Sequence, residues 1–297
     1  MRKNFFYSGI LSVFFFFTGL CSCQKTPDKN GFSDKNALSS RHVPTPLPIF
    51  PDSEDPTLPD VSPELPDPPV NPNVWDVSDV DISKIDPNRK LIAFTFDDAP
   101  ARYLENIMAV YADFNENNLD CVASATLFIN GYLCDAQSPA LLTAALALGF
   151  ELGNHTYSHA DLTTLSPAET AAEIDRVDDY LFAIDGKGRH LFRPPYGKIT
   201  DEQKNAATTP IISWTIDTVD WTGVDEEKIY QTIMQNKFSG TIVLMHDGHG
   251  HTVQALKRLL PDLKAAGYQV VSVSQMSKVH ACPLYKGKEY IRARKGQ

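Results

Sequence analysis

From Lys90 onward the chain alternates short runs of β-branched and aromatic residues with longer stretches that have a helical pattern. Short apolar runs separated by helical segments are typical of strand–helix units in a parallel sheet. The chain is therefore predicted to be an α/β protein. Its strands are expected at residues 91–96, 122–129, 150–153, 190–193, 211–216, 241–245 and 269–273.

Capping signals mark helices between these strands. Ser138-Pro139 and Ser166-Pro167 each place an N-cap serine before a proline suited to the first helical position, and Glu169 completes a capping box. The periodicity does not distinguish a closed barrel from an open sheet. In both architectures the functional residues gather at the carboxyl ends of the strands.

Most of the predicted strands are followed at once by side chains capable of chemistry. A turn explains any one of these groups, because Asp is common where a strand ends and Pro100 stops the first strand. Independent turns do not explain why His, Asp, Arg and Tyr recur at the same edge, so we interpret them as one functional site. The residues are Asp97 and Asp98, His155 and His159, Arg193 and Tyr196, Asp217 and Asp220, and His246.

The adjacent carboxylates Asp97 and Asp98 repel each other unless a cation lies nearby. Two imidazoles four residues apart, His155 and His159, together with one carboxylate make a three-ligand metal site that leaves a position open for water. Thr156 stands where the general base of an HExxH motif would be, so the base must come from elsewhere. It is expected to be whichever of the two adjacent aspartates does not bind the metal. This set of residues predicts metal-assisted hydrolysis.

Five segments, in this order, resemble the motifs of NodB-like polysaccharide deacetylases (carbohydrate esterase family four). The resemblance covers about residues 90 to 280 and implies an incomplete, distorted (β/α) barrel of about seven parallel strands. It also implies a hydrolase that removes N-acetyl groups from an amino-sugar polymer or oligosaccharide, peptidoglycan-like or chitin-like. The segments are Phe94–Pro100, His155–His159, Arg193–Gly197, Asp217–Trp221 and Leu244–His246.

The resemblance also assigns roles to residues around a metal. Asp97 is implied as the general base, with Arg193 pairing to hold it in place. The metal ligands are implied to be Asp98, His155 and His159, and zinc is the expected ion, with Co²⁺, Mn²⁺ and Ni²⁺ as alternatives.

Further roles implied by the resemblance concern the acetyl group and the leaving amine. The backbone N–H of Tyr196 is expected to stabilise the oxyanion, and His246 is expected to act as general acid with Asp217 tuning it. The acetyl pocket is implied to be walled by Pro195, Tyr196, Trp221 and Leu244. Outside the matched roles, Asp220 and Asp247 are interpreted as loop-capping residues, and His249 and His251 as rim residues.

Three rival functions use part of the same pattern. An O-acetyl esterase acting on acetylated xylan-type glycan needs the same groups, since an ester carbonyl is hydrolysed in the same way. A non-catalytic carbohydrate-binding lipoprotein is disfavoured because the full set is intact: Asp97, Asp98, His155, His159, Arg193 and His246. A glycosidase with paired carboxylates does not need two histidines four residues apart.

The first 23 residues resemble a lipoprotein signal peptide. Two basic residues precede about sixteen mostly apolar ones, too short for a typical membrane span. Leu20-Cys21-Ser22-Cys23 resembles a lipobox, which predicts a lipid on Cys23 and a membrane-anchored protein of the cell envelope. Residues 24–88 are rich in Pro and Asp and are predicted to be a disordered tether.

The rest of the sequence sets the limits of the catalytic domain and excludes some classes of partner. Residues 89–280 are assigned to the catalytic domain and 281–297 to a solvated basic tail. The net charge of −10 argues against nucleic acid as a ligand. Cys121, Cys134 and Cys282 do not define a disulfide framework and are expected to be free thiols. A monomer that acts on an acetylated glycan, with the lipid as its only membrane contact, is expected.

Overall fold

The computed structural model describes residues 71–296. The predicted signal peptide, Cys23 and the tether as far as residue 70 lie outside the described residues. Between residues 71 and 296 no helix combines the length and apolar character needed to cross a membrane.

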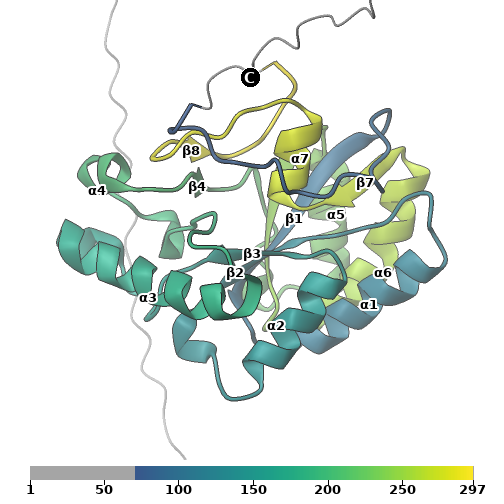
Figure 1. Ribbon diagram of the computed structural model, residues 1–297. Coiled ribbons are helices and arrows are strands. Elements are labelled where there is room, and N and C mark those ends of the chain that lie inside the picture. Colours follow the sequence, from purple (N-terminus) through teal and green to yellow (C-terminus); the bar gives the residue numbers. More distant parts are fainter. Residues whose placement is uncertain (1–70, 297) are drawn as a thin grey trace, which may run out of the picture. The chain divides into compact units, whose positions relative to one another are not determined.

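A parallel sheet occupies the middle of the domain, with helices outside it (Figure 1). The central strand β1 pairs with β6 along one edge, and with β7 and then β2 along the other. The strand order is β3-β2-β1-β6-β5, with β7 beside β1. The bounds are β1 Lys90–Ala99, β2 Thr126–Ile129, β3 Glu151–Asn154, β5 Ile216–Asp217, β6 Thr241–His246 and β7 Tyr268–Val271.

The sheet curves toward closure through a short, irregular segment. Phe192 forms isolated parallel bridges to Asn154 at the end of β3 and to Ile211 in β4 (Ile211–Ile212). β4 lies shortly before β5 in the chain, so the strands follow one another around an incomplete barrel. The fold predicted from the strand–helix pattern and the family resemblance is confirmed.

Two predicted strands differ from the structure in this irregular segment. Residues 190–193 form bridges only at Phe192, and the run 211–216 is divided into β4 and β5. The Arg193 side chain donates hydrogen bonds to the carbonyl oxygens of Ile212 and Ser213. Those carbonyls point at a guanidinium rather than at a neighbouring strand, so a regular ladder does not continue through them.

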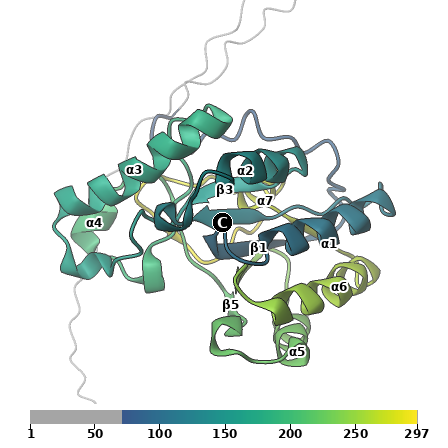
Figure 2. The same cartoon turned by 90° about the horizontal axis from the view of Figure 1, so that it is seen from below.

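Helices cover the outside of the barrel. Figure 2 shows α1, α6 and α5 side by side, in agreement with the packing of α6 between the other two. The predicted capping box at Ser166 and Glu169 is present at the start of α3, whereas Ser138 is the first residue of α2 and not its N-cap. The helices are α1 Leu104–Glu116, α2 Ser138–Ala147, α3 Pro167–Asp185, α4 Asp201–Ala206, α5 Glu226–Asn236, α6 Gly250–Ala265 and α7 Val273–Val279.

The domain extends beyond both predicted boundaries. On the N-terminal side, the backbone N–H of Trp75 donates to the carbonyl of Leu284 at 2.7 Å. On the C-terminal side, β8 (Glu289–Tyr290) pairs with β4, and Cys282 and Tyr290 are buried. The boundaries predicted at 88/89 and 280/281 are therefore too narrow, because apolar side chains on both flanks pack into one core cluster.

Candidate active site

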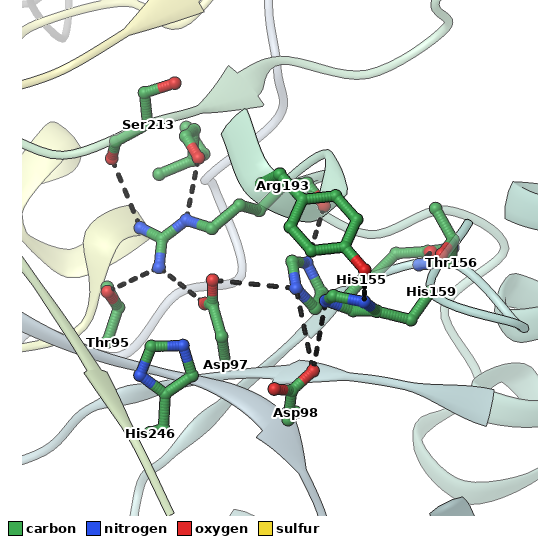
Figure 3. Close-up of polar contacts among 12 residues, drawn as sticks. Thr95, Asp97, Asp98, His155, Thr156, His159, Arg193, Ser213 and His246 are labelled. Atoms are coloured by element: carbon green, nitrogen blue, oxygen red, sulfur yellow. Dashed lines mark hydrogen bonds and ion pairs between the residues drawn. The ribbon is translucent and has the colours of Figure 1, made fainter. Parts of the chain in front are cut away.

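Three side chains, from the end of β1 and from the loop after β3, converge at the carboxyl end of the sheet (Figure 3). Asp98 lies near the end of β1, His155 directly follows β3, and His159 lies four residues later. One ligand atom from each lies within 4.8 Å of the others. The structure thus brings together the three predicted metal ligands.

The protonation of His155 follows from its partner. Its Nδ1 atom lies 2.8 Å from the backbone carbonyl oxygen of Arg193, which can only accept a hydrogen bond. Nδ1 must therefore carry the proton, and the lone pair of Nε2 faces Asp97 and Asp98 at 3.6 and 3.9 Å. Burial lowers the pKa of His155 below its ordinary value, against the opposing effect of these two carboxylates. The neutral imidazole is the form that binds metals.

His159 is oriented by an aromatic neighbour. Its Nε2 atom lies 3.3 Å from Asp98 Oδ1, and its Nδ1 atom lies 3.2 Å from the hydroxyl of Tyr196. The Tyr196 ring packs edge-on against the imidazole with ring centroids 4.7 Å apart. Both nitrogens of His159 therefore have a defined direction, one toward Asp98 and one toward η3 (Pro195–Gly197).

The donor set fits a divalent cation. Ligand atoms about 2.1 Å from a tetrahedral zinc ion lie about 3.4 Å from each other. The two histidine nitrogens lie 3.3 and 3.9 Å from Asp98 Oδ1, close to that spacing. The lone pair on His155 Nε2 also faces the carboxylate oxygens of Asp97 and Asp98. These electron-rich atoms repel one another unless a positive charge lies between them. These residues therefore suit a metal with nitrogen and oxygen ligands.

Asp97 is buried and paired with a cation. Its Oδ1 atom accepts a hydrogen bond from Arg193 at 2.7 Å, while Oδ2 faces His155. Burial alone would raise the pKa of Asp97, but the charge of Arg193 and the imidazoles of His155 and His246 lower it below its ordinary value. Asp97 is therefore an ionised carboxylate next to the metal ligands.

Arg193 is itself held by several partners. The side chain is fully buried and donates to Thr95 Oγ1 as well as to Asp97, each at 2.7 Å. It also donates to the carbonyls of Ile212 and Ser213, and its guanidinium carbon lies 4.1 Å from the centroid of the Phe128 ring. A guanidinium with this many partners cannot turn away, so the position of Asp97 is defined.

His246 lies beside Asp97 on the neighbouring strand and is paired with Asp220. The two residues His246 and Asp97 are register partners in β6 and β1, and Figure 3 shows the imidazole next to Asp97. His246 Nδ1 lies 2.8 Å from Asp220 Oδ1. Burial opposes protonation, but the hydrogen bond to Asp220 and the charges of Asp97 and Asp98 raise the pKa of His246 to about 9.

The structure corrects the predicted partner of His246. Asp217, expected to tune the imidazole, is the last residue of β5, and its Oδ1 accepts a hydrogen bond from the backbone N–H of Val219 at 2.8 Å. Asp220 begins η4 (Asp220–Thr222), is almost fully buried, and also accepts from the backbone N–H of His246 and from Thr252. The role of turn former therefore belongs to Asp217 and that of imidazole partner to Asp220.

Asp247 ties two loops of the site together. Its Oδ2 atom accepts from the backbone N–H of Ala101 at 2.8 Å, and its backbone carbonyl accepts from that of Tyr103 at 2.9 Å. Its Oδ1 has no hydrogen-bond partner among the described residues. Burial, with the nearby charge of Asp98, raises the pKa of Asp247 to about 7. The contact to Ala101 agrees with the predicted loop-capping role.

The predicted pocket residues differ in accessibility. Leu244 in β6 and Pro195 in η3 are buried, whereas Trp221 is 58% exposed and Tyr196 is 61% exposed. His249, a predicted rim residue, has its ring centroid 6.1 Å from that of His246. Of the four side chains predicted to surround the acetyl group, two are therefore buried and two are exposed aromatic rings.

Strained backbone is concentrated in these loops. A non-glycine residue with positive φ is uncommon and costs about 1–3 kcal/mol. Every such residue among positions 71–296, except Ala281, lies at the end of β1 or in a loop of the site. Surrounding contacts must hold these conformations, which indicates that the loops are shaped for a purpose other than stability. The residues are Asp98 (φ 61°), Thr156 (67°), His159 (56°), Tyr196 (60°) and Val219 (52°).

One residue of the site, Thr95, was missed by the sequence analysis, and another, Asp220, was given the wrong role. Thr95 contacts Arg193 and lies two positions before Asp97 on the same strand. Because side chains two residues apart on a strand share a face, the sequence could have placed Thr95 beside Asp97. Asp220 was placed in the right segment with the wrong role. The spacing of Asp217 and Asp220 offers two carboxylates, and only the fold shows which of them reaches His246.

The barrel and its site define a hydrolase of the α/β class with a metal-binding site at the strand ends. The chain belongs to the polysaccharide deacetylase family, whose profile matches residues 84–210. It is 35% identical over 199 residues to a peptidoglycan-N-acetylglucosamine deacetylase of Bacillus cereus, covering 64% of this chain and 89% of that protein.

Two further relatives support the same placement. The chain is 33% identical to the peptidoglycan-N-acetylmuramic acid deacetylase PdaC of Bacillus subtilis, over 66% of this chain and only 40% of that protein. Among solved structures, a T48 deacetylase with substrate superposes with a TM-score of 0.63 at 28% identity, covering 69% of this chain and 99% of that one. The chain thus spans less than half of the length of PdaC.

Proposed function

We propose that this protein removes N-acetyl groups from the amino sugars of a peptidoglycan-like or chitin-like glycan. The observation that carries the proposal is the placement of the Asp97 carboxylate and the His246 imidazole as register partners beside three side chains that could hold a metal ion. Amide hydrolysis needs a base for water and an acid for the leaving amine. The names of the relatives support an acetylated amino sugar as substrate.

Asp98, His155 and His159 would hold the divalent cation, with Zn²⁺ the ion that best suits two imidazoles and a carboxylate. When bound, the cation polarises the acetyl carbonyl and lowers the pKa of water. The hydrogen bond from His155 to the carbonyl of Arg193 keeps the ring turned toward this position. The contact between His159 and Tyr196 does the same for the second imidazole.

Asp97 would act as the general base. It takes a proton from the water whose oxygen bonds to the acetyl carbon. The ion pair with Arg193 keeps the carboxylate ionised and fixes the oxygen that faces the metal ligands. The backbone N–H of Tyr196 is proposed to donate to the oxygen that becomes negatively charged on the acetyl group.

His246 would act as the general acid. It donates its Nε2 proton to the sugar nitrogen while the carbon–nitrogen bond breaks, which yields acetate and a free amine. Asp220 holds the opposite nitrogen of the ring and favours the protonated form. Pro195, Trp221, Leu244 and Tyr196 are proposed to surround the acetyl group.

The protein is proposed to act at the cell envelope as a lipid-anchored monomer. The Leu20–Cys23 segment supports a lipid on Cys23 as the membrane contact. The Pro- and Asp-rich residues that follow would then separate the catalytic domain from the membrane surface.

Acetate release from three polymers tests the function. N-acetylated chitooligosaccharides, peptidoglycan and acetylated xylan are each incubated with the full protein, with and without a chelator. Release from an amino-sugar polymer that stops with chelator supports the proposal. Release from acetylated xylan alone would identify an O-acetyl esterase, and no release from any of them would indicate a carbohydrate-binding protein without turnover.

A further inference from the structure

Helix α3 holds the loop that bears the two histidines of the metal-ligand set. Thr156 and His159 in this loop have positive φ, and a non-glycine residue keeps that conformation only where its surroundings impose it. Two backbone N–H groups of the loop, those of Tyr157 and Ser158, donate hydrogen bonds to α3. The helix therefore supplies part of the support that this strained backbone needs.

Glu173 of α3 contacts the loop with both its side chain and its backbone. Its Oε2 atom accepts a hydrogen bond from the backbone N–H of Ser158 at 2.7 Å. Its backbone carbonyl accepts one from the N–H of Tyr157 at 3.1 Å. Because Tyr157 and Ser158 both lie between His155 and His159, one residue of α3 fixes two successive peptide groups between the two imidazoles.

A second connection from α3 reaches the loop through Asn154, which is fully buried at the end of β3. The Oδ1 atom of Asn154 accepts a hydrogen bond from the backbone N–H of Thr156 at 2.9 Å. The Nδ2 atom donates to the carbonyl of Ile174 at 2.8 Å and to Asp178 Oδ1 at 2.9 Å. The two acceptors on α3 therefore determine the direction of the amide, and the amide holds the left-handed turn at Thr156.

Asp178 is itself held by the segment that leads into Arg193. His190 Nδ1 lies 2.9 Å from Asp178 Oδ1, and the Arg189 side chain donates to Oδ2 at 3.2 Å. The backbone carbonyl of Arg193 in turn orients the imidazole of His155. Asp178 thus joins two supports of the same loop, the helix α3 and the segment before Arg193.

Resting on the metal site of the proposed function, we propose that Glu173 and Asp178 are positioning residues that hold this loop in the conformation that binds the cation. Neither carboxylate belongs to the metal-ligand set: Glu173 acts on the backbone between the histidines, and Asp178 acts through Asn154. Without these contacts the strained backbone relaxes toward ordinary angles, and the imidazoles lose their alignment with Asp98. Binding of the cation must then reorder the loop, which lowers the affinity.

The affinity of the metal-free protein for Co²⁺, measured by titration without substrate, tests the proposal. Glu173→Ala and Asp178→Ala are each expected to weaken binding about 10–100-fold, the usual effect of losing a group that orients a metal ligand. Glu173→Gln keeps an oxygen acceptor for Ser158 and should retain most of the affinity. Adding Asp178→Ala to Asn154→Ala should cause little further loss, since Asp178 acts through Asn154.

Two control variants on α3 separate positioning from stability. Asp179→Ala changes the exposed carboxylate next to Asp178 and should bind Co²⁺ as the wild type does. Leu181→Ala removes a buried apolar side chain from the same helix, so it should unfold at a lower urea concentration but bind Co²⁺ with unchanged affinity. If Asp178→Ala does not fold, Glu173→Ala, at a half-buried position, still gives the result.

Wild-type affinity in Glu173→Ala, or an equal loss of affinity in Leu181→Ala, would overturn the proposal. Full additivity of Asn154→Ala and Asp178→Ala would overturn the role of Asp178. Because no substrate is present, a loss of affinity in Glu173→Ala supports the proposal even if the wild type releases no acetate. A wild type that bound no Co²⁺ would overturn the metal site and this proposal together.

Discussion

His246 and Asp220 form a partly buried pair that joins β6 to the loop after β5. The imidazole Nδ1 lies 2.8 Å from Asp220 Oδ1, and the same carboxylate accepts the backbone N–H of His246 through Oδ2 at 2.8 Å. One side chain therefore sets both the position and the charge of the imidazole. This pair connects residues that are 26 positions apart.

The first prediction concerns the pH dependence of turnover. His246 acts as an acid only while protonated, so kcat should fall as pH rises through its pKa, about 9 before the opposing charge of a bound cation is added. Asp220→Asn removes the carboxylate that raises this pKa, so the alkaline limb should move to lower pH and kcat should decrease. Asp217→Asn is the matched control and should leave the limb in place. A shift of the alkaline limb in Asp217→Asn but not in Asp220→Asn would show that Asp217, as first expected from the sequence, is the residue that tunes His246.

The second prediction separates the two adjacent aspartates. Asp98→Ala and His155→Ala each remove a ligand, so metal affinity should fall by at least about 100-fold, and activity with it. Asp97→Asn should retain the metal and lose turnover. Metal content after dialysis, measured by mass spectrometry beside acetate release, reports both effects. If Asp97→Asn emptied the site while Asp98→Asn did not, the two roles would be exchanged.

The third prediction uses the leaving group. His246→Ala should reduce turnover of an N-acetyl sugar on the order of 10²–10⁴-fold, the usual cost of losing a general acid. An activated aryl acetate leaves without a proton, so the same variant should lose much less on that substrate. The ratio of the two losses is the measurement. Equal losses would show that His246 does not protonate the leaving group.

The fourth prediction concerns stability and rests on a buried histidine outside the active site. His190 Nδ1 and Nε2 lie 2.9 and 3.1 Å from the carboxylates of Asp178 and Asp185. Burial opposes its charge, but the two hydrogen bonds raise the pKa of His190 above its ordinary value. Its stabilising effect is therefore fully present below the unfolded pKa of about 6.5 and is lost as pH rises through the folded pKa.

His190→Ala should accordingly lower the free energy of unfolding by about 3–5 kcal/mol near pH 6, since it removes the cation between two buried carboxylates, of which Asp178 keeps its contact with Arg189. The difference from the wild type should shrink as pH rises through the raised pKa of folded His190. Urea denaturation at a series of pH values measures it. His251→Ala, which breaks an exposed pair with Glu226, is the control and should cause no measurable change. A difference that grew with pH would contradict a protonated His190.

The fifth prediction concerns the anchor. Cys23→Ser should abolish incorporation of a fatty-acid probe, whereas Cys21→Ser should still be labelled, because the predicted lipobox ends at Cys23. Metabolic labelling followed by fractionation of membranes measures both. Continued labelling of the Cys23→Ser variant would disprove the assignment.

The alternation of strands and helices, and the position of most site residues, could be predicted from the sequence. These features are local: the apolar run of β1 leads directly into Asp97 and Asp98, and a capping box starts α3 at Ser166. The carboxyl ends of parallel strands meet at one edge, so side chains that follow different strands come together without knowledge of the packing. The grouping of Asp98, His155 and His159 is a direct consequence.

Contacts between distant segments were decided only by the tertiary structure. Asp217 and Asp220 are three residues apart and chemically identical, and the sequence does not say which of them meets His246. The choice depends on the turn at Val219, which uses Asp217 for its own hydrogen bond and carries Asp220 beneath the imidazole. The flanks around Trp75 and Tyr290 were missed for the same reason, since they are held by partners far along the chain. Local pattern determines elements, whereas long-range packing determines which side chains they bring into contact.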